Sequence, residues 1–185
     1  MKIKLFIYLT LLSTIAFGQD KGSSISYNKL IDLKGTNFIV ATVENYKKMF
    51  SVESYNLLFI NVISGDTNQF VFQKGTYISE VEQIKIDSLQ INKVVFTANT
   101  IDLDKNNSID WKDPRQVFVC SVDGTEKKQI TEDKFFTRTW IVNSKTGNLI
   151  ITGKYDSNGN GKDDTSDKSE ILVYDLKTMS LIKKI

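Results

Sequence analysis

Residues 147–176 read GNLIITGKYDSNGNGKDDTSDKSEILVYDL, in which two apolar runs enclose an acidic segment. The runs 149–152 and 171–174 consist mainly of Leu, Ile, Val and Tyr, residues that favour β-strands. The segment between them, 156–167, consists mainly of Asp, Asn, Gly and Ser, which favour turns. The stretch therefore predicts two strands joined by an acidic loop of twelve residues.

The same pattern occurs 54 residues earlier in the chain. The aligned segments are 93–98 with 147–152, 102–113 with 156–167, and 117–120 with 171–174. Self-similarity at a fixed offset is the signature of a repeat architecture. Each copy reads as strand, turn, strand, acidic loop, strand, turn and strand.

A fainter third copy precedes these two, over residues 38–72. The connection between its strands, 44–55, lacks the acidic pattern. We therefore expect an all-β fold of about three four-stranded antiparallel sheets. The units should cover about 34–74, 75–131 and 132–185.

Two of the expected strands are apolar without alternation. They are Val117-Phe118-Val119 and Ile171-Leu172-Val173. Such runs indicate strands that are buried on both faces. Sheets stacked against neighbouring sheets would produce this burial.

Part of the chain resembles the WD40-like repeat of TolB-type β-propellers. The residues that carry the resemblance are Gln129-Ile130-Thr131, Trp140, the run 146–151 and the run 170–176. It covers most of 75–185 and implies propeller-like blades. TolB-like propellers often serve as platforms for protein interaction, so the resemblance also implies a protein partner.

Three units are fewer than the four or more blades of an ordinary closed propeller. We therefore expect an open or incomplete ring of three blades. One alternative is a β-sandwich. Another is self-association, in which a second copy covers the exposed ends of the stack.

Both acidic loops place oxygen-bearing side chains at positions 1, 3, 5, 9 and 12 and a backbone carbonyl at position 7. In this they resemble the calcium loops of EF-hand and dockerin-like proteins. Calcium takes six to eight oxygen ligands, and every side-chain candidate here offers oxygen. We expect two structural Ca²⁺ sites. The expected ligands are Asp102, Asp104, Asn106, Ser108, Asp110 and Asp113 in the first loop, and Asp156, Asn158, Asn160, Lys162, Asp164 and Asp167 in the second.

The loops depart from the EF-hand pattern at position 12, where both have Asp instead of Glu. The shorter side chain reaches less easily for two-point binding, so calcium affinity should fall and Mg²⁺ should compete. Position 6 needs a left-handed backbone, which suits Gly161 best and Asn107 next. The alternative is that Asp, Asn and Gly only form good turns. Net charges of −2 and −3 in the two loops nevertheless favour a bound cation.

The composition excludes several kinds of site. With no histidine, the chain has no Ser-His-Asp triad, no Cys-His pair and no histidine-containing zinc site. The single cysteine, Cys120, excludes an internal disulfide and should be a buried, inert thiol. Trp140 and the Phe135-Phe136 pair are expected in the core, whereas Trp111 is either exposed or a lid over the first loop.

The N-terminus predicts export. Residues 1–18 begin with two lysines, continue with the apolar run 5–17 and end in Ala16-Phe17-Gly18, as in a secretory signal peptide. This ending resembles signal peptides of Bacteroidetes-type bacteria. The apolar run is shorter than the ~20 residues of a membrane span. Cleavage would leave one domain, 19–185, secreted or periplasmic and without a membrane span.

Loss of the two leader lysines lowers the number of basic residues from 24 to 22, equal to the 22 acidic ones. A neutral chain gives no electrostatic case for binding nucleic acid. The favoured function is a secreted, calcium-stabilised binding module without catalytic activity. The alternative is a small hydrolase that uses carboxylates on carbohydrate or peptide. The acidic pairs Glu80 with Glu82 and Glu132 with Asp133, expected beside strand ends, would be its candidates.

Overall fold

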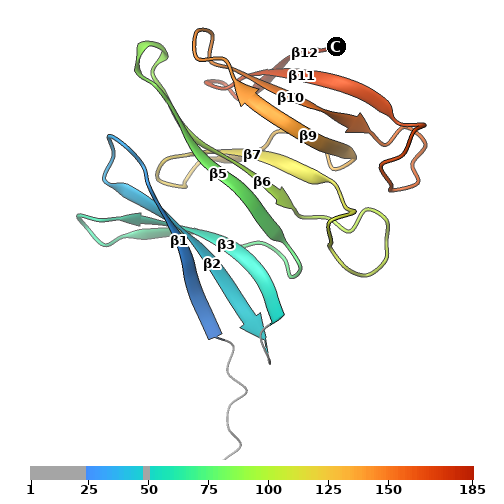
Figure 1. Cartoon of the computed structure of the whole chain (residues 1–185). Helices are drawn as coiled ribbons and strands as arrows, with labels where there is room; N and C mark the ends of the chain where they lie inside the picture. Colours follow the sequence, from blue (N-terminus) through green and yellow to red (C-terminus); the bar gives the residue numbers. More distant parts are fainter. Residues whose placement is uncertain (1–23, 48–50) are drawn as a thin grey trace, which may run out of the picture.

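The computed structural model of the chain describes residues 24–47 and 51–185 (Figure 1). The predicted signal peptide, residues 1–18, lies outside these residues. Within them, twelve strands form three four-stranded antiparallel sheets, called here the first, middle and last sheets in chain order. In each sheet the strands are neighbours in sequence order, so each sheet comes from one continuous segment.

The strand bounds are as follows. The first sheet contains β1 (Ser24–Asp32), β2 (Phe38–Lys47), β3 (Ser51–Asn61) and β4 (Thr67–Phe70). The middle sheet contains β5 (Tyr77–Ile86), β6 (Ile91–Asn99), β7 (Arg115–Ser121) and β8 (Lys127–Gln129), with a 3₁₀ turn, η1 (Asp87–Leu89), between β5 and β6. The last sheet contains β9 (Phe135–Val142), β10 (Asn148–Tyr155), β11 (Lys168–Asp175) and β12 (Ser180–Lys184).

The expectation of an all-β chain with three four-stranded antiparallel sheets is confirmed. Each acidic loop joins the second and third strands of its sheet, β6 to β7 and β10 to β11. Both loops lie at the same side of the molecule (Figure 1). Among the described residues, no helix has the length and apolar character needed to cross a membrane.

The middle sheet is buried on both faces. In β6, Val94 and Phe96 belong to a core shared with the first sheet, whereas Val95 belongs to a core shared with the last sheet. Successive side chains of a strand point to opposite faces, so the unbroken apolar run Val94–Phe96 serves two cores at once. We call the core shared with the first sheet the first core, and the core shared with the last sheet the second core.

The first core is rich in aromatic rings. Phe96 stacks on Phe118 with ring centroids 5.0 Å apart, and Phe72 meets both rings edge-on at about 6 Å. Phe59 and Phe70 from the first sheet form another edge-to-face pair at 5.3 Å. Offset and edge-to-face pairs add to the stabilisation from burial alone.

The second core is mainly aliphatic. It contains Leu149, Ile151 and Leu172 from the last sheet, all buried against the middle sheet. Phe135 and Phe136 are buried as predicted. Trp140 packs against this core and donates its Nε1–H to Glu80 Oε2 at 2.9 Å. Trp140 therefore contributes to the core and also links the last sheet to the middle sheet through this hydrogen bond.

Burial on both faces is confirmed for β7 and wrong for β11. Val117 and Val119 face the second core, while Cys120 faces the first. In β11, Leu172 faces the second core, but Ile171 on the opposite face is 38% exposed. The last sheet ends the stack among the described residues, so nothing described covers its outer face.

Three other details differ from the sequence prediction. β1 was not predicted, because it pairs with β2 alone and its side chains are mostly exposed, so it lacks an apolar pattern. The predicted connection at 44–55 is wrong: β2 and β3 run through it, and Glu44 pairs with Tyr55. The placement of Glu80 beside a strand end is also wrong, since it lies within β5 at a bulge with φ of 24°.

We predict that Phe96→Ala lowers the free energy of unfolding by about 3–5 kcal/mol. The reason is the cavity that it leaves among the rings of Phe70, Phe72 and Phe118. Urea unfolding followed by tryptophan fluorescence measures the change. Ile141→Ala on the outer face of the last sheet is the control, since its side chain is 66% exposed. Equal losses for the two variants would contradict a two-faced middle sheet.

Candidate metal centre

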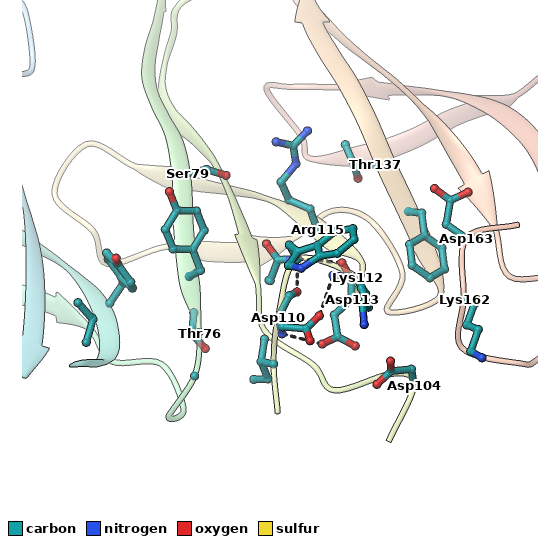
Figure 2. A pocket seen from close by; sticks show the side chains of 18 of the residues that line it. Thr76, Ser79, Asp104, Asp110, Lys112, Asp113, Arg115, Thr137, Lys162 and Asp163 are labelled. Atoms are coloured by element: carbon teal, nitrogen blue, oxygen red, sulfur yellow. Dashed lines mark hydrogen bonds between the residues drawn. The ribbon is translucent and has the colours of Figure 1, made fainter. Parts of the chain in front are cut away.

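In both acidic loops, the side-chain carboxylate at position 12 accepts the same two backbone N–H groups. The carboxylate of Asp113 accepts N–H groups from positions 2 and 9 of its loop, at 2.8 and 2.9 Å (Figure 2). The carboxylate of Asp167 accepts N–H groups from the same two positions, at 3.1 and 2.9 Å. Each position-12 side chain thus ties the start of its loop to its end.

The side chains at positions 1, 3 and 5 also accept backbone N–H groups in both loops. Asp102 and Asp156, at position 1, both accept from positions 5 and 6. Position 3 accepts from position 5, at 3.1 Å for Asp104 and 2.9 Å for its counterpart Asn158. Position 5 accepts from position 7, the predicted carbonyl ligands Ser108 and Lys162, at 2.9 and 2.8 Å. The side chains are therefore turned into the loops.

Both loops have left-handed residues at positions 4 and 6. The φ angles at position 6 are 71° for Asn107 and 72° for Gly161, which confirms that prediction. Position 4 was not predicted, and there Lys105 and Gly159 have φ angles of 59° and 72°. A lysine in this conformation is unusual, since only Gly, Asn and Asp adopt it readily.

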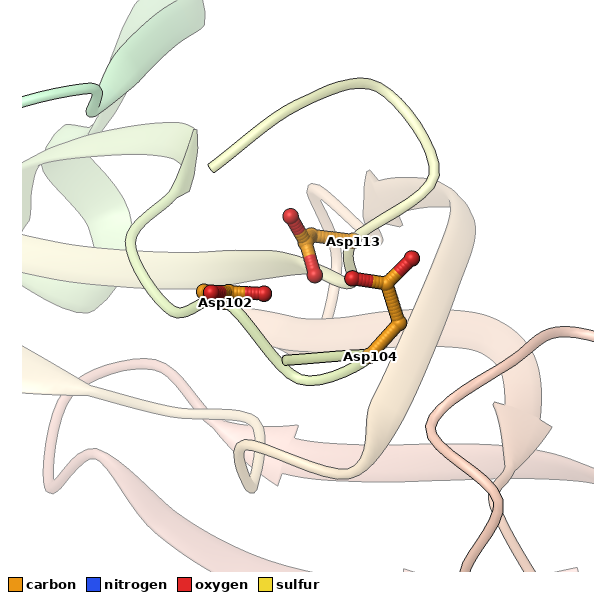
Figure 3. Close-up of side chains that lie close together, drawn as sticks. All are labelled: Asp102, Asp104 and Asp113. Atoms are coloured by element: carbon orange, nitrogen blue, oxygen red, sulfur yellow. The ribbon is translucent and has the colours of Figure 1, made fainter. Parts of the chain in front are cut away.

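Three of the predicted ligands of the first loop converge. One carboxylate oxygen from each of Asp102, Asp104 and Asp113 lies within 4.8 Å of the others (Figure 3). Oxygens that share one calcium ion at about 2.4 Å can be up to about 4.8 Å apart, so this spacing fits a single cation. Burial raises the pKa of the Asp113 carboxyl, and the backbone N–H groups that it accepts oppose this shift.

The position-9 carboxylates complete the acidic lining. Asp110 accepts the side-chain amide of Asn106 at 3.4 Å, and Asp164 accepts that of Asn160 at 2.7 Å. The hydroxyl of Ser166, followed by the Asn160 amide, holds the pKa of Asp164 well below its usual range. In the second loop, the carboxylates of Asp156, Asp164 and Asp167 thus accept backbone N–H groups from the same loop positions as their counterparts in the first loop.

Asp163, at position 8 of the second loop, turns away from the loop interior. Its carboxylate contacts Arg138 of β9 and lies 3.4 Å from Lys154 Nζ of β10. These two ion pairs attach the loop to its own sheet. No local sequence signal identifies them, because the partners lie 25 and 9 residues away.

The two loops touch each other. A Cβ at Gly161 would lie 2.5 Å from the Leu103 carbonyl oxygen and 2.9 Å from Asp104 Cα. The second loop therefore packs its left-handed glycine directly on the backbone of the first. This contact joins the loop ends of the middle and last sheets.

A groove of about 1290 Å³ lies beside the loops, lined by all three sheets (Figure 2). Asp104, Asp110 and Asp113 belong both to its lining and to the first loop. Trp111 is 85% exposed, so it is not packed as a lid on the loop. Two further lining residues, Arg115 and Arg138, were not predicted from the sequence. Their signal in the sequence is that all other basic residues are lysines.

No family model matches the sequence, and no curated protein is significantly similar to it. A solved structure with a distant likeness is the acylaminoacyl peptidase of Pyrococcus horikoshii (orthorhombic crystal form), with a TM-score of 0.45 and 13% identity. The likeness covers 88% of this chain and 25% of that chain, so this chain spans about a quarter of the peptidase.

We predict that Gly161→Ala destabilises the protein more than Gly159→Ala. Both residues have a φ of 72°, so both variants meet the strain of about 1–2 kcal/mol for a left-handed alanine. Space around Gly159 is open, whereas a methyl group at Gly161 would clash with the first loop. Urea unfolding of both variants measures the difference, and equal losses would mean that the loops are not in contact.

We also predict that Cys120 is unreactive in the folded protein. Burial raises the pKa of its thiol to about 12. The thiol should react with an aromatic disulfide reagent at pH 8 only after denaturation, and fast reaction of the native protein would contradict its burial. Because the unfolded thiol ionises near pH 9 and the folded one near 12, this group lowers stability as the pH rises from 9 towards 12.

Proposed function

We propose that this chain is a secreted, calcium-stabilised, β-propeller-like binding module without catalytic activity. The observation that carries the proposal is the duplicated loop. Two segments 54 residues apart share their side-chain acceptors, their left-handed positions and their place between the second and third strands of a sheet. Turn preference alone explains one such loop better than it explains two matching ones.

The charges of the first loop support a bound cation. Three carboxylate oxygens within 4.8 Å of one another repel when all are ionised. Backbone N–H groups orient these carboxylates but carry no net charge. A divalent cation would offset two of these negative charges, and oxygen ligands of this kind are those that calcium prefers.

We assign the metal a structural role. The loops connect strands of the middle and last sheets and touch at Gly161, so cations in both would stiffen that junction. The sheets would then act as blades of an open, propeller-like stack. The outer face of the last sheet, with Ile141 and Ile171 exposed, is where a protein partner or a second copy would continue the stack.

The alternative function, a small hydrolase acting on carbohydrate or peptide, needs a carboxyl group in the groove that is free to transfer protons. Outside the first loop, the acidic lining residues are Glu53 and Asp163. Glu53 pairs with Lys74 at 3.2 Å, and Asp163 pairs with Arg138 and Lys154. Both carboxylates are thus held by cationic side chains of the protein itself. Binding is therefore the better-supported function.

We predict that millimolar calcium raises the melting temperature of residues 19–185 relative to EDTA. Calcium at a hundred times its Kd stabilises by about 2.7 kcal/mol, which corresponds to roughly 5–10 °C for a domain of this size. Differential scanning calorimetry provides the measurement, and magnesium provides the comparison for selectivity. No shift with either cation would remove the metal from the proposal and favour the hydrolase.

Site-directed variants assign the ions to the loops. Asp102→Asn and Asp156→Asn keep side-chain size and remove one charge, so each should abolish or weaken one of two calcium sites in titration calorimetry. Asp66→Ala, in the turn of the first sheet, is the control and should keep both sites. If both loop variants bind as the unmodified protein does, the loops are turns only.

A further inference from the structure

The groove beside the loops is larger than the pocket of a small ligand. Its volume is about 1290 Å³, whereas pockets for drug-sized molecules have roughly 300–1,000 Å³. Tyr55 of the first sheet, Tyr77 of the middle sheet and Thr137 of the last sheet all contribute to its lining (Figure 2). These dimensions suit an extended, oligomeric ligand.

The only two arginines of the sequence both line this groove. Arg115 donates from Nη2 to the Arg138 carbonyl at 3.0 Å and from Nη1 to Glu80 at 3.5 Å. Arg138 in turn donates to Asp163. Both guanidinium groups are thus held in place, and each has further N–H donors that pair with no described residue. The planar fork of arginine suits two-point binding of carboxylates, which lysine does not provide.

The charge of the groove depends on the first loop. Lys112 and Lys162 also line the groove, and neither forms an ion pair with another described residue. The acidic lining residues Asp104, Asp110 and Asp113 are predicted calcium ligands. The whole lining has five acidic and four basic side chains, so one bound Ca²⁺ ion would change its net charge from −1 to +1. An anionic ligand would then be favoured.

The uncharged groups of the groove suit a sugar. Trp111 and Tyr77 line it with side chains that are 85% and 51% exposed, and so offer aromatic surface to a ligand. Lys112 Nζ lies 5.6 Å from the Trp111 ring centroid, and Tyr55 makes an edge-to-face contact with Tyr77. Pyranose rings offer both hydroxyl groups and apolar faces.

We propose that this groove binds a carboxylate-bearing oligosaccharide, an inference that rests on the proposed function because it needs the metal-bound first loop. The sugar carboxylates contact Arg115 and Arg138. The apolar faces of the sugar rings lie on Trp111 and Tyr77. A peptide of acidic residues alone would satisfy the arginines but would leave the two aromatic side chains without matching partners.

The test is titration calorimetry of the purified protein in millimolar calcium with three probes. A hyaluronan hexasaccharide alternates glucuronate with N-acetylglucosamine, chitohexaose contains N-acetylglucosamine alone, and hexaglutamate carries carboxylates without sugar. We expect the hyaluronan hexasaccharide to bind at least tenfold more tightly than either of the others, and EDTA to abolish its binding. Equal or tighter binding of chitohexaose or hexaglutamate would overturn the ligand class.

Two variants locate the site. Trp111→Ala and Arg138→Gln should each weaken hexasaccharide binding at least tenfold, whereas Lys145→Gln, an exposed lysine in the turn between β9 and β10, should leave it unchanged. Trp111 is so exposed that its replacement keeps the fold, which preserves the test if Arg138→Gln unfolds. Unchanged binding by Trp111→Ala would overturn the assignment to this groove.

The calcium melting experiment separates the two proposals. A calcium-induced rise in melting temperature with no hexasaccharide binding would overturn the groove inference and leave the calcium-stabilised module standing. Absence of calcium binding, together with absence of hexasaccharide binding, would overturn both. Hexasaccharide binding that persists in EDTA would show that the ligand does not need the metal, and would overturn the inference as stated.

Discussion

Burial of the middle sheet on both faces is the constraint on which the rest of the structure depends. A sheet with two apolar faces is stable in water only when another layer covers each of them. In β6, Val94 and Phe96 face one neighbouring sheet and Val95 faces the other. The flanking sheets need one apolar face each, and their edge strands β1 and β12 are mostly exposed.

Stacking also determines where connections run. Since the faces of the middle sheet are covered, its connections must run at the ends of the strands, and both acidic loops gather at one end (Figure 1). Their carboxylates satisfy backbone N–H groups that would otherwise be unpaired, which gives each loop a fixed shape. Those hydrogen bonds leave the negative charge in place, and it faces the groove that all three sheets line.

Features encoded by adjacent residues could be predicted from the sequence. These include the apolar runs of β7 and β10, the two matching loops and the left-handed positions of Asn107 and Gly161. Features that depend on contacts between distant residues could not. The pairing of β1 with β2, the ion pairs of Asp163 and the meeting of Arg115 with Arg138 arise only when the sheets are assembled. The groove belongs to this second class, because no single sheet contains it.

Each sheet is built from one continuous segment, and no strand crosses from one sheet to another. A gene that encodes such a chain can gain or lose a whole sheet by tandem duplication or deletion without changing the strand connections of the remaining sheets. Each added copy meets its neighbour through the same kind of apolar face. The loop pattern shared by the middle and last units is what a duplication of this kind leaves behind. The first unit, whose sequence has no acidic loop, shares only the order of strands with them.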